Sequence, residues 1–226
     1  WAHHMFTVGM GRGLNIWFAV ITMVVGIPTG IKIFNWIATM YGGKIRFRVP
    51  MLFAIAFIGQ FLIAGLTGIM LSGAPLTWQL SDSYFVVAHF HYVLIGGLLF
   101  TVFGAFYYWF PKMFGWMMSD RLGKIHFWGT IIPFNLIFIP LFFLGAGGQH
   151  RRIYNFQNFP ALDGQGMWDL RILATVSLLV MLGFQVVFFY NFIMSLVKGK
   201  KAGKNPWQAN TLEWTADSPP PHGNWK

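Results

Sequence analysis

Hydrophobic residues fall into five long runs that short polar segments separate. A helix needs about 20 mostly apolar residues to cross the hydrocarbon core of a bilayer, and each run reaches that length. A soluble core does not require runs this long, so the pattern predicts an all-α, polytopic transmembrane helix bundle. The predicted spans cover approximately residues 15–40, 51–73, 84–110, 125–147 and 170–197.

The two ends of the chain differ from these runs. Residues 1–10 look like the end of an earlier, sixth span, and the chain starts without an initiator Met. We therefore expect a fragment or a split subunit, with its remaining N-terminal part as a partner. Residues 1–197 form the predicted membrane domain. Residues 198–226 are polar and Pro-containing, and they are predicted to form an extended surface tail.

Composition agrees with a membrane protein. Hydrophobic residues make up 56% of the chain and charged residues only 10%, against about 25% charged residues in soluble domains. The net charge of +10 comes from basic residues in short loops, which is where orientation signals belong, so a nucleic-acid partner is not expected. Cysteine is absent from the sequence, so a metal site must use His, Asp, Glu or backbone oxygen.

Basic residues orient the predicted spans, because cytoplasmic loops of membrane proteins carry an excess of Lys and Arg. The connections over 41–50 and 111–124 and the start of the tail are basic, whereas 74–83 carries one acid, Asp82, and no base. This alternation places the basic connections and the C-terminus on the cytoplasmic or matrix side.

One basic pair breaks this alternation. Arg151 and Arg152 lie in the connection over 148–169, on the side predicted to face outward. A guanidinium pair near a membrane surface can bind carboxylates in a bidentate manner. An anionic ligand would therefore explain the pair, and a solvated pair or one that contacts lipid headgroups is the alternative.

His89-Phe90-His91 is the sharpest chemical signal, because ionisable residues inside a span are rare and usually functional. Residues two apart on an α-helix point about 200° apart, so these two imidazoles cannot share one metal ion. They can instead serve two metals on opposite faces, and His is the usual axial ligand of haem iron. The alternative is a pair of core histidines that are hydrogen-bonded to neighbouring helices.

His3-His4 is the second signal. Adjacent helical residues diverge by about 100°, so two imidazoles can converge on an ion between them if a third ligand comes from elsewhere. Ligation by nitrogen alone suits copper. A solvated surface pair is the alternative. The remaining histidines, His126, His150 and His222, have no partner spacing and are interpreted as interfacial or loop residues.

Lys32 is the third signal, about nine residues or roughly 14 Å from the predicted cytoplasmic end of its span. Pro28 removes a backbone donor and can leave a carbonyl free. Together with Thr29 and Thr22, Lys32 is predicted to form a polar track for protons. A snorkelling lysine next to a helix kink is the alternative.

These signals, in this order, resemble subunit I of the haem–copper oxidases, and of the cytochrome c oxidases in particular. The resemblance covers the whole chain, from the end of helix VII through helix XII of that family. It rests on the motifs Trp-Ala-His-His-Met-Phe-Thr at 1–7, Ile-Pro-Thr-Gly-Ile-Lys at 27–32, Val-Val-Ala-His-Phe-His-Tyr-Val at 86–93, the Arg pair, and the tail motifs Asn-Pro-Trp at 205–207, Thr-Leu-Glu-Trp at 211–214 and Ser-Pro-Pro-Pro at 218–221.

The resemblance implies ligands for two haems of the haem A type and for one copper. His91 would bind the low-spin haem, His89 the high-spin haem, and His3 with His4 the copper. Arg151 and Arg152 would hold haem propionates, Lys32 and Thr29 would belong to a proton path, and Asp82 would bind Mg²⁺. Ser81 and Thr77 depart from the family pattern, and Ser81 weakens the Mg²⁺ prediction.

The implied function is that of a terminal respiratory oxidase in the bacterial plasma membrane rather than the mitochondrial inner membrane. Such an enzyme reduces O₂ to water, takes electrons from cytochrome c through other subunits, works with subunits II and III, and translocates protons. The alternatives are a quinol-oxidising member and a nitric oxide reductase, which Lys32 argues against. A polytopic transporter would explain the apolar runs but not the histidine motifs.

Overall fold

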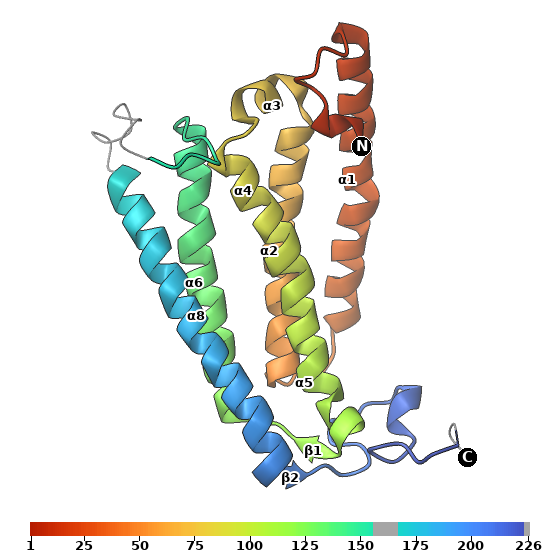
Figure 1. The fold of residues 1–226 in the computed structure, drawn as a ribbon. Helices are drawn as coiled ribbons and strands as arrows, with labels where there is room; N and C mark the ends of the chain where they lie inside the picture. Colours follow the sequence, from red (N-terminus) through yellow and green to blue (C-terminus); the bar gives the residue numbers. More distant parts are fainter. Residues whose placement is uncertain (156–166, 224–226) are drawn as a thin grey trace.

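The computed structural model describes residues 1–155 and 167–223. It is a bundle of long helices that run roughly alongside one another (Figure 1). The helices are α1 (Arg12–Met40), α2 (Val49–Ser72), a continuous rod made of α4 (Tyr84–His91), η2 (Tyr92–Leu99) and α5 (Phe100–Phe114), then α6 (Asp120–Ala146) and α8 (Met167–Lys198).

The rod α4–η2–α5 lies at the centre of the bundle, where it contacts α2 on one side and α6 on the other. Helix α1 packs outside α2, and α8 packs along α6 (Figure 1). Gly129 on α6 allows this last contact, because the ring of Phe184 occupies the space that a Cβ at residue 129 would need. The histidine motif therefore lies in the middle of the bundle.

Five helices in the described residues are long and apolar enough to cross a membrane, as the hydrophobic pattern predicts. Two of their boundaries differ from the predicted ones by four residues or more, for local reasons. Helix α5 continues to Phe114, where Gly115 adopts a left-handed φ of 75° and its N–H bonds to Pro111 O. Helix α6 begins at Asp120, because the Ser119 hydroxyl caps it by accepting from Leu122 N–H.

The segment that follows the histidine motif is a π-helix, Tyr92–Leu99. It lies against α2 so closely that a Cβ on Gly96 would come within 2.7 Å of Gln60 Cβ. On its other side, the Tyr92 hydroxyl donates to Asn135 Oδ1 of α6 at 2.8 Å. Short π segments are common at functional sites, and here one holds the two neighbouring helices together directly beyond His91.

The basic connections lie at one end of the bundle, together with the C-terminal end of α8 (Figure 1). At that end β1 (Trp116–Met117) pairs with β2 (Lys200–Lys201) in an antiparallel register. At the other end the short helix α3 (Ala74–Leu80) connects α2 to α4, and the N-terminal residues form one 3₁₀ turn, η1 (Ala2–His4). The alternation in the loop charges thus corresponds to two opposite ends of the bundle.

The C-terminal segment is anchored to the bundle at Trp214, while its other described residues stay exposed or half-buried. Trp214, in η4 (Leu212–Trp214), is only 2% exposed, and its indole N–H donates to the Tyr108 hydroxyl at 2.8 Å. Lys112 donates to Ala216 O at 2.9 Å and lies over the Trp214 ring. Burial of one large aromatic side chain outweighs the polar character of the segment.

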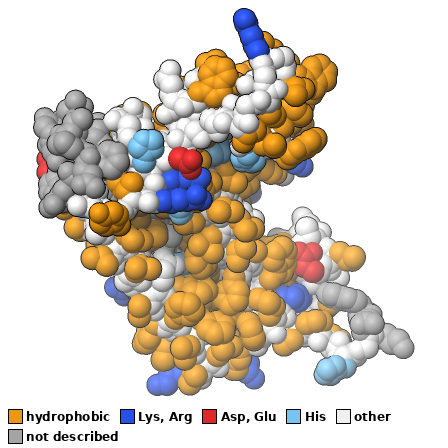
Figure 2. All heavy atoms as spheres, turned by 45° about the horizontal axis from the view of Figure 1, so that its top comes forward, with side chains coloured by type: hydrophobic (Ala, Val, Ile, Leu, Met, Phe, Trp, Pro, Cys, Tyr) orange, Lys and Arg blue, Asp and Glu red, His pale blue; other side chains and the backbone are white. Residues whose placement is uncertain are grey.

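An aromatic core fills the bundle. Phe53 of α2 is fully buried and contacts the rings of Phe100, Tyr107 and Phe127 from α5 and α6. Hydrophobic side chains also cover much of the outer surface (Figure 2). A bundle that is apolar both inside and outside is typical of helices in lipid.

Candidate functional site

The two histidines of the central helix face different neighbours. The ring of His89 lies against α2, where a Cβ on Gly68 would come within 3.1 Å of His89 Cε1. The ring of His91 stacks on Phe138 of α6, with ring centroids 4.5 Å apart and planes inclined by 20°. The opposite-face geometry predicted from the spacing is confirmed, and each imidazole has its own surroundings.

Both rings are oriented through Nδ1. Thr67 Oγ1 donates its single proton to a carbonyl one turn earlier on α2, Ile63 O or Ala64 O, so it accepts the N–H of His89 Nδ1 at 3.0 Å. His91 Nδ1 donates to Val87 O at 2.8 Å. These bonds select the tautomer whose lone pair is on Nε2, as hydrogen-bonded histidines do when they bind a metal ion.

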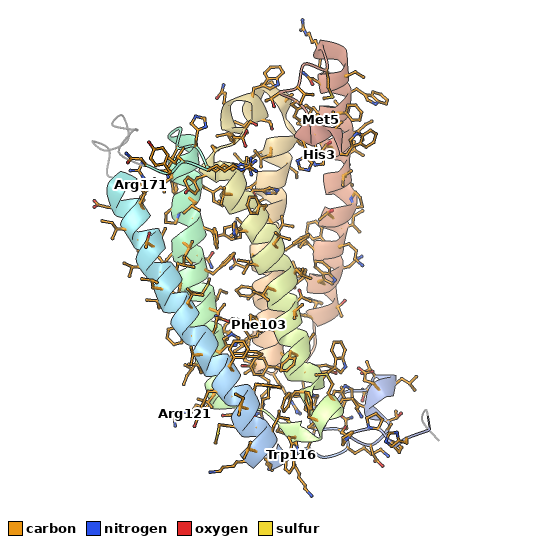
Figure 3. All side chains as sticks on the ribbon, in the orientation of Figure 1. His3, Met5, Phe103, Trp116, Arg121 and Arg171 are labelled. Atoms are coloured by element: carbon orange, nitrogen blue, oxygen red, sulfur yellow. The ribbon has the colours of Figure 1, made fainter. Side chains whose placement is uncertain are left out.

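His3 and His4 converge. Their Nε2 atoms are 3.0 Å apart, and their ring centroids are 4.1 Å apart. The pair sits on a 3₁₀ turn rather than on the α-helix assumed from the sequence. Thr22 of α1 lies 3.5 Å from His3 Nδ1, and Figure 3 shows His3 next to that helix. Two imidazole nitrogens this close can act together on a single cation.

His89 is close to this pair. Burial lowers the pKa of His3, and the nearby charges of His4 and His89 lower it further. His89, on α4, thus lies within electrostatic reach of the pair on η1. Within the part of the chain that the structure describes, no three His, Asp or Glu side chains are grouped so that they could hold one metal ion.

Lys32 and its neighbours lie along α1. The Lys32 amine is 6.0 Å from the centre of the Trp36 ring, and its side chain is exposed on the surface that this chain presents. Thr29 donates to Val25 O at 3.2 Å. Thr22, seven residues before Thr29 on the same face of the helix, reaches His3. The side chains of Thr29 and Thr22 thus follow one face of α1 toward the His3–His4 pair, and the role of this face as a proton track stays a prediction.

Asp82 and Arg151 form an ion pair at the end of the bundle opposite the basic loops. Arg151 donates Nε–H to Asp82 Oδ1 at 2.8 Å and a terminal N–H to the same atom at 2.7 Å, while its backbone N–H bonds to Asp82 O. The hydrogen bond from Arg151 lowers the pKa of Asp82. Basic, acidic and His side chains gather at this end (Figure 2). The propionate and Mg²⁺ assignments for Arg151, Arg152 and Asp82 stay predictions.

His126 is a functional candidate that the sequence analysis placed wrongly. It is fully buried in α6 rather than interfacial. The side-chain amide of Gln185 on α8 donates its N–H groups to Thr130 Oγ1 and Met181 O. Its Oε1 is an acceptor, so His126 Nε2 donates to it at 3.2 Å. Nδ1 then accepts from the Tyr107 hydroxyl of α5 at 3.2 Å. His126 is thus a neutral cross-link between three helices, whose partners lie too far away in the sequence for spacing to reveal.

Comparison with known proteins identifies the family. The family model described as "Cytochrome C and Quinol oxidase polypeptide I" matches residues 1–177, more than half of the chain. The chain belongs to this family. The family resemblance seen in the motifs is therefore confirmed.

Individual relatives agree over the whole chain. The protein named cytochrome c oxidase subunit 1 from Alkalihalophilus pseudofirmus is 45% identical over 226 residues, covering 100% of this chain and 35% of the relative. The protein of the same name from Synechocystis is 46% identical over 220 residues, covering 97% of this chain and 39% of the relative. The chain thus spans little more than a third of the length of these oxidase subunits.

The fold of the oxidase chain also matches a solved structure. A cryo-EM structure of a heme-copper terminal oxidase dimer aligns with a TM-score of 0.73 at 18% sequence identity, covering 89% of this chain and 40% of that one. At this identity the match concerns the fold. With its membrane-spanning helices and bacterial oxidase relatives, the chain is part of an integral membrane protein.

Proposed function

We propose that the chain is the C-terminal part of the catalytic subunit of a terminal respiratory oxidase, which reduces O₂ to water and couples this reaction to proton translocation. One observation carries the proposal: His89 and His91 face different helices, each with Nδ1 hydrogen-bonded, while the His3–His4 pair converges near His89. Electrons come from cytochrome c through other subunits, as in the relatives named for that activity.

The residues present would supply some of the ligands of two haems and one copper. His91 would hold the low-spin haem, His89 the high-spin haem, and His3 with His4 the copper; imidazole nitrogen suits both metals. When bound, these groups would supply the site at which O₂ binds and the electrons for its reduction. Arg151 and Arg152 would bind the carboxylates of the haems, and Asp82 would be a ligand of Mg²⁺.

The protein's own contribution is to fix the ligands and to admit protons. Thr67 and Val87 hold the two imidazoles in the tautomer that offers Nε2. The Phe138 ring limits the rotation of His91 by stacking on it. Lys32 takes a proton from the cytoplasmic side, and the face of α1 that carries Thr29 and Thr22 leads it toward His3.

Orientation follows from the charge at the two ends of the bundle. The end that carries the basic connections and the C-terminus would be cytoplasmic, in a bacterial plasma membrane. A tag placed after residue 226 in intact cells should be inaccessible to a membrane-impermeant label and become labelled only after permeabilisation. Labelling from outside would reverse the orientation.

The haem assignment is tested by two variants of the full complex. His91→Ala should lose the optical spectrum of the low-spin haem and retain the high-spin one. His89→Ala should lose the high-spin haem and all O₂ reduction. His222→Ala, in the exposed C-terminal segment, is the matched control and should retain both haems. Normal turnover in either site variant would refute the assignment. An unaltered complex whose optical spectrum lacks haem bands would refute the oxidase proposal itself.

A further inference from the structure

A groove runs along the seam between α6 and α8. Its volume is about 890 Å³, and one end is lined by Asp120, Arg121 and Lys124. Beyond that charged end its walls are apolar, with Ile125, Trp128, Ile132, Val180 and Phe184 among the lining residues. Figure 3 shows Arg121 at the lower end of α6, the same end as the basic connections. The groove thus has a polar mouth at one membrane surface and an apolar interior.

The dimensions of the groove match one leaflet of a bilayer. From Asp120 to Pro133, the last lining residue on α6, the helix rises about 20 Å. Half of a hydrocarbon core is about 15 Å, and the headgroup layer adds several more. A second apolar hollow of about 520 Å³ shares Trp128 and Ile132 and continues along the same seam. A chain that enters at the charged mouth therefore meets apolar walls over the full depth of the leaflet.

The charge at the mouth favours an anion. Asp120 is neutralised by Lys124, 2.9 Å away, and by Arg48, 4.0 Å away. Together with Arg121, the mouth carries three cations and one carboxylate, and the positive end of the α6 dipole adds to them. The cations are partly or fully exposed, so they can reach a ligand in the headgroup layer.

We propose that this groove binds one anionic phospholipid, with its phosphate between Arg121 and Lys124 and one acyl chain along Ile125, Ile132 and Val180. Basic pockets between transmembrane helices on the cytoplasmic side are typical binding sites for such headgroups. A helix of a partner subunit is less favoured, because it brings no phosphate to the basic mouth.

The headgroup is tested on the purified full complex that contains this chain, reconstituted with phosphatidylglycerol and phosphatidylcholine in equal amounts. Native mass spectrometry should find phosphatidylglycerol retained in preference to phosphatidylcholine. Arg121→Gln combined with Lys124→Gln should reduce this preference about thirtyfold, because each of the two basic residues near an anionic surface contributes about 1 kcal/mol. The control is Lys44→Gln with Lys198→Gln, which removes the same charge from exposed positions outside the groove. It should keep the preference.

The acyl chain is tested separately. Val180→Trp fills the groove without changing its charge and should release the lipid, whereas Val176→Trp, one turn away and outside the groove, should not. Equal lipid retention in the charge variant and the wild type would overturn the proposal. So would a photoreactive residue at position 132 that captures a protein subunit instead of lipid. These readouts do not depend on haem, copper or turnover.

Discussion

The Nε2 atoms of His3 and His4 lie 3.0 Å apart, although the two residues are adjacent in the chain. The convergence occurs on the 3₁₀ turn of η1, although successive residues there are rotated by about 120°. It predicts that His4→Ala loses copper at least about tenfold while it retains both haems, because one of two paired ligands is gone.

Metal analysis of the purified complex measures this copper content, with His222→Ala as a control outside the site. Copper retained at one ion per complex in His4→Ala would exclude the pair as ligands. Iron found in place of copper in the unaltered protein would move the chain to the nitric oxide reductase branch.

Thr67 positions His89 without being a ligand itself. Thr67→Val removes the acceptor for Nδ1–H and should change haem affinity or turnover by about 10- to 100-fold, with a shift in the high-spin haem spectrum only. Thr67→Ser restores the hydroxyl and should restore the spectrum. An unchanged spectrum in the Val variant, or a change confined to the low-spin haem, would show that the hydrogen bond has no such role.

Lys32 is predicted to carry protons rather than to stabilise the fold. Lys32→Met keeps the length of the side chain and removes its proton-carrying group. The variant should assemble with both haems and copper, yet reduce its high-spin haem very slowly and turn over little. Haem content and reduction rate are measured in one preparation. Poor assembly combined with a near-normal rate in the assembled fraction would identify a structural lysine instead.

The buried His126 network is predicted to stabilise the packing of α5, α6 and α8. Tyr107→Phe leaves the buried His126 Nδ1 without its donor, which costs about 1–3 kcal/mol and should lower the thermal midpoint of the complex. Thr39→Val removes a hydroxyl bond on exposed α1 and serves as the control.

The double variant Tyr107→Phe with His126→Leu provides a second check of this network. Its destabilisation should be smaller than the sum of the two single changes, because both remove the same hydrogen bond. Strict additivity of the midpoint shifts would mean that the two side chains are not coupled.

The ion pair of Asp82 and Arg151 is predicted to stabilise the bundle in a pH-dependent way. Because Arg151 lowers the folded-state pKa of Asp82, the contribution is complete above the ordinary value of 3.8 and disappears as pH falls through the lowered value. Asp82 is largely exposed, so Asp82→Asn should cost less than about 1 kcal/mol at neutral pH. Thermal midpoints of variant and wild type should converge below that lowered pKa, and a gap that widens in acid would contradict the assignment.

The sequence by itself determined the five spans, the alternation of basic connections and the opposite faces of His89 and His91. Each of these follows from local information: the length of an apolar run, the charge of a loop, or the 100° step of a helix. Family membership was also readable from motifs that lie close together in the chain.

Only the tertiary structure decided what those residues touch. His89, His126 and Arg151 each form a hydrogen bond with a residue far away in the sequence, at separations of 22, 59 and 69 residues. No periodicity in the sequence encodes such pairs. The docked tail is a similar case, since its polar composition says nothing about the one Trp214 side chain that anchors it. The groove between α6 and α8 is a further case: the Phe184 ring packs against Gly129, 55 residues earlier, and this contact is set by packing in three dimensions.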